Sequence, residues 1–198
     1  GLKEDVDRLK YELTADTFAQ EYLADFRKYT GTVYKDFDRA VHVVEPFEIH
    51  ESWQVYRGLD FGSNNPTACV FVGVDSDDNW FVVDEYYKSG ETIDYHAGVL
   101  NANRYSSRVV SSYGDPSGAQ WINEFAQRRV FIQPATKDTG QNPAGWVRFG
   151  IEKVAERLKI LPGHIVQNVK QASTDTFQKG LPKLFVFSTC TNLVREFE

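Results

Sequence analysis

Three apolar runs joined by very short loops constrain the fold of this chain more than any other feature. The run WQVYRGLDFG (53–62) is followed after the turn SNNP by TACVFVGVD (67–75), and after the turn DSDDN by NWFVVDEYY (79–87). Strands joined by loops this short pair as antiparallel neighbours, because a parallel connection needs a crossover of a dozen or more residues. The sequence therefore predicts a three-stranded antiparallel meander.

Helix and strand patterns alternate after the meander. Helical spacing marks residues 92–105, 116–129 and 144–158, and strand patterns mark residues 107–115, 130–135 and 183–188. The helix that follows the third strand permits a crossover, so the fourth strand can lie parallel to the first. This order predicts an α/β fold with a mixed five-stranded sheet and helices on both faces, which resembles the ribonuclease H-like arrangement.

The chain divides into two regions by pattern. Residues 1–52 are expected to form a helical lead-in and a connecting arm, and residues 53–198 the α/β domain. No apolar run approaches the roughly 20 residues of a membrane span, so no membrane partner is expected.

The net charge of −6 argues against a protein that only coats nucleic acid, because such proteins are basic. It does not argue against an enzyme that acts on nucleic acid, since such an enzyme can have carboxylates in its active site.

Two aspartates follow strands that this order brings side by side. Asp60 ends the first strand, and Asp115 ends the fourth, in SSYGDPSGAQW. Neighbouring carboxylates repel each other unless a cation lies between them, and hard oxygen ligands suit Mg²⁺ or Mn²⁺. Such a pair would support phosphodiester hydrolysis. Taken singly, Asp60 is more typical of a strand-end turn than of a ligand, and Asp115 could equally be a helix N-cap. Asp84 and Glu85 are expected on an exposed strand face.

These motifs together resemble the nuclease domain of large terminase subunits, the DNA-packaging motors of tailed bacteriophages. The resemblance rests on FAQEYLADFRKYTGTVYKDFD, YRGLDFGSNNPTACVFVGVD and GDPSGAQWINEF, and it runs over nearly the whole chain. It implies a metal-dependent endonuclease that cuts concatemeric double-stranded viral DNA by a two-metal mechanism, with Asp60 and Asp115 as catalytic residues and metal ligands.

The resemblance also implies partners and a location. The partners would be double-stranded DNA, a packaging ATPase domain of the same subunit, the portal and the small terminase subunit. The protein would act in the host cell cytoplasm during virion assembly. Lys137 and Arg148, near the expected active-site edge, are the predicted contacts to the DNA backbone.

The sequence departs from the family pattern at two places. The third acid of the family is expected beyond Glu198, because Glu196 and Glu198 come too early for its motif, and two metal ions are expected only when that acid is present. Residues 159–182 form a long lysine-bearing segment that could be a two-stranded flap beside the site or a surface loop.

Two other functions remain open from the sequence. One is an actin-like phosphotransferase or ATPase on a related fold, in which DFGSNNP (60–66) would hold a nucleotide phosphate. The other is a DNA-gripping module without catalysis, which the missing third acid would favour.

Overall fold

The computed structural model describes residues 33–62, 65–135, 143–169 and 180–198, with the side chains of 143–148 left out. The chain divides into two compact units. One comprises residues 1–35 and 137–156, and its described part is mainly helix α5 (Pro143–Leu158). The other comprises residues 36–136 and 157–198 and contains the whole sheet.

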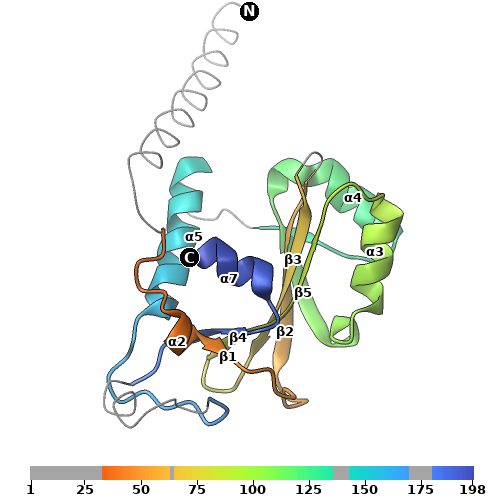
Figure 1. The fold of residues 1–198 in the computed structure, drawn as a ribbon. Coiled ribbons are helices and arrows are strands. Elements are labelled where there is room, and N and C mark those ends of the chain that lie inside the picture. The colour runs from red at the N-terminus through yellow and green to blue at the C-terminus, as the bar shows by residue number, and fades with distance from the viewer. Residues whose placement is uncertain (1–32, 63–64, 136–142, 170–179) are drawn as a thin grey trace, which may run out of the picture. The chain divides into compact units, whose positions relative to one another are not determined.

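The sheet of the second unit has seven strands in its described residues (Figure 1). In spatial order they are β1 (Val43–Val44), β7 (Leu184–Phe187), β4 (Trp80–Lys88), β3 (Thr67–Val74), β2 (Gln54–Asp60), β5 (Val109–Gly114) and β6 (Gln133–Pro134). The antiparallel meander β2–β3–β4 and the parallel pairing of β5 with β2 are as predicted. The mixed ribonuclease H-like fold class is therefore confirmed.

The sheet is wider than the five strands that the sequence predicts. The added width lies beyond β4, where β7 pairs in parallel with β4 and β1 pairs in parallel with β7. Strand β1 has two residues, and so short a segment leaves no alternating pattern to detect. Its place is fixed by packing, because Phe47, which follows it, contacts Trp53, Phe81 and Phe187 with its ring.

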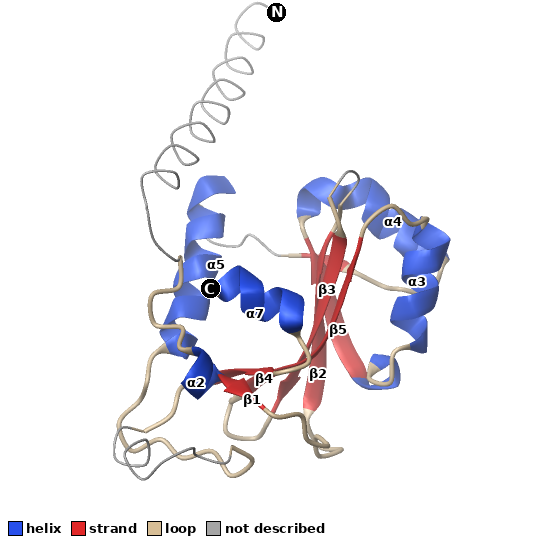
Figure 2. Ribbon diagram, viewed as in Figure 1, coloured by secondary structure: helices blue, strands red, loops and turns tan. Residues whose placement is uncertain are grey.

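Helices lie on both faces of the sheet (Figure 2). Helices α3 (Ile93–Ala102) and α4 (Ala119–Gln127) lie on one face, with the short helices η1 (Ser106–Arg108) and η2 (Pro116–Gly118) beside them. Helix α7 (Thr191–Phe197) lies on the other face, and α2 (Arg39–His42) precedes β1. None of the helices in the described residues is both long and apolar enough to span a membrane.

The two faces of the sheet differ in burial. Along β3, the side chains that face α3 and α4 are buried, including Cys69 and Phe71, and those between them are half-exposed. Antiparallel pairs share a face, so Asp60, Ala68 and Tyr87 all lie on the half-exposed side, the side that also carries α7. We call this side the open face.

The predicted flap at 159–182 is described only at its two ends. Leu161 and Leu181 form an antiparallel bridge, and the backbone carbonyl of His164 accepts a hydrogen bond from the backbone N–H of Leu181. The His164 ring also contacts the buried Asn79 at 2.8 Å, in the turn between β3 and β4. That turn is at the opposite end of β3 from the residue that pairs with Asp60. The described ends therefore do not lie beside the site, and residues 170–179 fall outside the described part.

The predicted boundary at residue 52 stays a prediction. Residues 36–52 belong to the same compact unit as the sheet. Most of the predicted arm, residues 1–32, lies outside the described residues. Where the arm is described, it is held to the unit by the buried His42, whose Nε2 donates to the carbonyl of Leu158 at 2.8 Å.

A buried histidine predicts how stability depends on pH. His96 of α3 lies 2.5 Å through Nδ1 from the Tyr86 hydroxyl, and burial lowers its pKa below 6.5 although Glu91 opposes the shift. The unfolded chain therefore binds more protons than the folded chain as pH falls below about 6.5, so the free energy of unfolding decreases. In urea titrations between pH 7 and pH 5, the stability advantage of wild type over His96→Gln should shrink as pH falls. A constant advantage would contradict this assignment.

Candidate active site at the ends of β2 and β5

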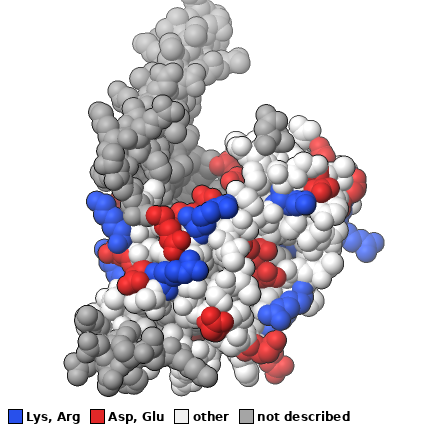
Figure 3. Space-filling model, viewed as in Figure 1, with Lys and Arg blue, Asp and Glu red and all other residues white. Residues whose placement is uncertain are grey.

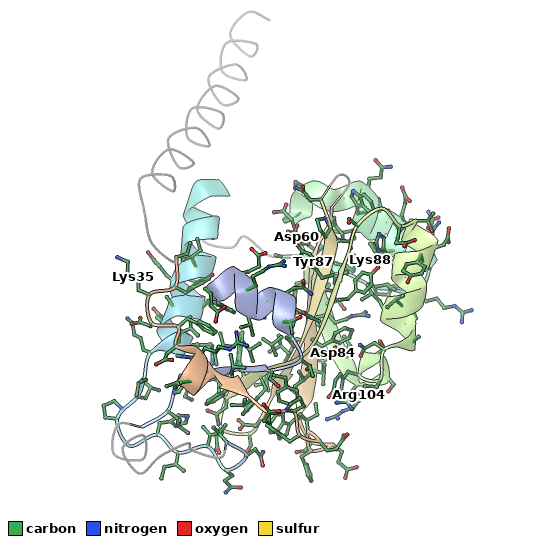
Figure 4. The ribbon with its side chains drawn as sticks, in the orientation of Figure 1. Lys35, Asp60, Asp84, Tyr87, Lys88 and Arg104 are labelled. Atoms are coloured by element: carbon green, nitrogen blue, oxygen red, sulfur yellow. The ribbon has the colours of Figure 1, made fainter. Side chains whose placement is uncertain are left out.

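The strand register places Asp60 and Asp115 side by side. In the parallel pair β2–β5, Gly58 is opposite Tyr113 and Leu59 is opposite Gly114. The next residues along the two strands are Asp60 and Asp115. Adjacent strands lie about 4.8 Å apart, so both carboxylates begin at one edge of the sheet. Because residues two apart share a face, both aspartates lie on the open face, and Figure 4 marks Asp60 there at the end of β2.

The residue after Asp60 explains how this edge is held. Phe61 points to the opposite face from Asp60, where its ring stacks on Trp121 at 6.2 Å between centroids and lies 5.9 Å from the Phe125 ring. Both partners belong to α4, and Phe125 is fully buried. Phe61 thus fixes the end of β2 to the helix that follows Asp115.

The same ring accounts for the two glycines around Asp115. A Cβ atom added to Gly114 would lie 2.7 Å from Cζ of Phe61, and one added to Gly118 would lie 2.8 Å from its Cε2. Real Cβ atoms do not approach so closely, so both positions need glycine to admit the ring. The motifs LDFG (59–62) and GDPSG (114–118) are therefore two halves of one packing arrangement.

A buried arginine joins the same two strands on the α3 and α4 face. Arg57 of β2 donates from Nε to the Ser112 hydroxyl of β5 at 2.9 Å, and its guanidinium lies 5.9 Å from the centre of the Phe71 ring. Burial lowers the pKa of Arg57. One of its terminal nitrogens has no hydrogen-bond partner among the described residues. This residue secures the register that sets Asp60 beside Asp115.

The two carboxylates differ in their hydrogen bonding. Asp60 is exposed and makes no hydrogen bond to the described residues. Asp115 caps η2, with Oδ1 accepting from the backbone N–H of Ser117 at 2.7 Å, so the N-cap expected from the sequence is present. A cap does not exclude metal binding, because a carboxylate has about four acceptor sites.

The chemistry of this donor set fits a hard divalent cation. Mg²⁺ is usually held by one or two carboxylates, with waters completing its octahedron. Asp60 and Asp115 supply that number from rigid strand ends. Within the described residues, no group of three or more His, Cys, Asp or Glu side chains could hold a metal ion.

Asp84 and Glu85 have structural contacts and are half-buried, not exposed as predicted. Asp84 accepts from the Asn103 side chain at 2.7 Å. Glu85 accepts from the backbone N–H groups of Asn192 and Leu193, both at 2.8 Å, and so holds the first turn of α7 against β4. A carboxylate at a helix N-terminus is stabilised by the unpaired N–H groups there.

Neither cysteine is placed for nucleophilic chemistry. Cys69 and Cys190 are free thiols and are buried. Burial raises the pKa of each to about 12. Both are therefore protonated near neutral pH and pack as small apolar side chains.

The structure leaves the two predicted DNA contacts open. Lys137 lies outside the described residues, and Arg148 lies on α5 among residues whose side chains are not described.

Sequence reasoning missed Phe61, the residue that packs the two motifs together. The available signal was an aromatic residue directly after Asp60 combined with glycines on both sides of Asp115.

The packing of Phe61 predicts the effect of adding one methyl group. Gly118→Ala should lower the free energy of unfolding by about 1–3 kcal/mol, because overpacking shifts the ring or the backbone. Gly98→Ala is the matched control, since a Cβ there meets nothing within 4 Å in the interior of α3, and alanine should stabilise by about 0.5–1 kcal/mol. Urea unfolding of both variants measures the difference. Equal effects of the two substitutions would refute the close packing of Phe61.

Comparison with known proteins relates the chain to phage terminases. No protein-family model matches the chain. A large terminase subunit of Escherichia phage T5 is 27% identical over 143 residues, which cover 67% of this chain and 32% of that protein. The chain thus spans about a third of the length of this curated relative.

Solved structures give the fold. The nuclease domain of the P22 large terminase superposes with a TM-score of 0.60 at 21% identity, covering 85% of this chain and 78% of that one. The nuclease domain of the SPP1 large terminase, determined with bound Mn, superposes with a TM-score of 0.53 at 17% identity, covering 84% and 80%. This chain is therefore similar in sequence to a phage large terminase subunit and has the fold of the terminase nuclease domain.

Proposed function

We propose that this chain is the nuclease part of a phage large terminase and cleaves double-stranded viral DNA during packaging. The observation that carries the proposal is the register of β2 and β5, which sets Asp60 and Asp115 together on a half-exposed sheet face. The sequence similarity to a large terminase subunit favours this function over an actin-like phosphotransferase.

Asp60 and Asp115 are the residues that would hold the divalent cation, Mg²⁺ or Mn²⁺. Such an ion activates water and stabilises the leaving oxygen in phosphodiester hydrolysis. The Mn-bound state of the SPP1 nuclease domain supports a divalent metal in this fold. The protein's own contribution is to hold both carboxylates on strand ends fixed by Phe61 and Arg57, so little reorganisation accompanies binding.

Two acids can hold one ion, and a second ion needs another ligand. The two glutamates that the sequence places too early for the third acid each face an arginine instead. Glu198 pairs with Arg39 at 3.1 Å, and Glu196 lies 3.6 Å from Arg195. The third acid stays a proposal, as do two-metal catalysis, the ATPase domain of the same subunit, and the portal and small-subunit partners. The host cytoplasm as the place of action is likewise proposed. All follow from the terminase resemblance.

Substitution of either aspartate tests the proposal. Asp60→Asn and Asp115→Asn should each abolish nicking of supercoiled plasmid in Mn²⁺, because each removes a charged ligand. Melting temperatures without metal should stay within a few degrees of wild type or rise, since carboxylate repulsion is relieved and asparagine caps a helix as well as aspartate does.

The matched control is Asp94→Asn, whose carboxylate is exposed on α3 and pairs with Arg128 at 2.6 Å. It should cut at the wild-type rate. If Asp60→Asn or Asp115→Asn cuts as fast as this control, the site is assigned to the wrong residues.

A further inference from the structure

The register of the meander places Tyr87 on the same face as Asp60, with one small residue on the strand between them. Asp60 pairs with Ala68 on β3, and Ala68 pairs with Tyr87 on β4. All three side chains lie on the open face, and Figure 4 labels Asp60 and Tyr87 near the same end of the sheet. Two strand spacings separate the Cα atoms of Asp60 and Tyr87 by about 10 Å. Since the residue between them is alanine, no large side chain rises from β3 to separate them.

Tyr87 is exposed and its hydroxyl is not used by the described structure. Its relative exposure is 39%, and it lies near the end of β4, in the part of the strand that β7 does not pair with. Among the described residues, its ring has a cation–π contact with Arg195 and its hydroxyl makes no hydrogen bond. An exposed aromatic ring with an uncommitted polar end is typical of a recognition surface.

Helix α7 brings a cation to the same ring. The Arg195 guanidinium carbon lies 6.0 Å from the centre of the Tyr87 ring, within cation–π range. Arg195 is 64% exposed in its side chain, and its ion pair with Glu196 is long at 3.6 Å. Exposed pairs of this kind contribute little, so the guanidinium can exchange this partner for a phosphate.

The position of α7 is fixed independently of Arg195. Val194 and Phe197 bury its inner side, and Glu85 binds its first-turn N–H groups. The arginine therefore extends next to Tyr87 from a helix that other contacts hold in place. On the face drawn in Figure 3, acidic and basic side chains of the described residues are interspersed and form no single basic patch.

We propose that Tyr87 and Arg195 together bind a backbone phosphate of duplex DNA next to the cleavage site. The inference rests on the proposed nuclease function and names contacts for it. Arginine binds phosphate through two parallel N–H donors, and a tyrosine hydroxyl is a common donor to phosphate oxygens. The cation–π contact holds the guanidinium over the ring before DNA arrives, which reduces the ordering cost of binding.

The test measures DNA affinity without cleavage. The full 198-residue chain is titrated into a fluorescent DNA duplex in Ca²⁺, with anisotropy recorded at several salt concentrations. Arg195→Gln should weaken binding roughly tenfold, and it should reduce the slope of log K against log[salt] by about 0.9, since one phosphate contact is lost. Tyr87→Phe should weaken binding roughly threefold with an unchanged slope, because it removes a neutral hydrogen bond.

Arg39→Gln is the matched control, because Arg39 is also exposed and also pairs with a glutamate, Glu198. It should bind DNA with the wild-type affinity and slope. Melting temperatures of all variants should agree with wild type, since these side chains are exposed. If Tyr87→Phe alters folding, Tyr87→Leu is the second variant, because it also lacks the hydroxyl and should weaken binding at least as much.

The outcomes separate the two proposals. If wild type binds no duplex at all, the nuclease function itself fails. If wild type binds and nicks DNA while Arg195→Gln and Tyr87→Phe bind as tightly as Arg39→Gln, only the phosphate contact is overturned. Tighter binding of an RNA duplex than of DNA would overturn the DNA assignment of this surface.

Discussion

The packing of the Phe61 ring against Gly114 and Gly118 is the constraint on which the rest of the site depends. This ring joins the end of β2 to the beginning of α4, two segments separated by more than fifty residues of chain. Asp60 lies on the open face, and the next side chain, Phe61, packs against α4 on the other face, so a single strand end serves both the packing and the site. Two carboxylates repel each other, and only a rigid framework holds them together without a cation.

Much of the fold was predictable because its signals are local. The meander follows from three apolar runs with loops too short for crossovers, and α3, α4 and α5 follow from helical spacing. Contacts between segments far apart in the sequence were harder to predict. Val43–Val44 forms a strand only because β7 offers an edge, and Glu85 is half-buried only because α7 returns to it. Asp60 and Asp115 could be paired from strand order, whereas Tyr87 and Arg195 required the register of three strands and the position of α7.

The two faces of the sheet have different roles. The α3 and α4 side encloses Arg57, Phe71 and His96. The α7 side carries the aspartates and the exposed rings, and α7 is held there by Glu85 at its first turn and by its buried Val194 and Phe197. The edge that carries Asp60 and Asp115 is secured from the opposite face by Phe61 and Arg57, so its own face stays uncovered. This explains why the residues around the site are half-exposed although the strands beneath them are central.

Anomalous scattering from crystals of the chain grown with Mn²⁺ tests the central claim most directly. The account predicts a manganese peak at about 2 Å from a carboxylate oxygen of Asp60 and from one of Asp115. The same peak should be absent from crystals of Asp60→Asn. A well-occupied manganese bound to other carboxylates, with none touching Asp60 and Asp115, would contradict the assignment of this edge as the metal site.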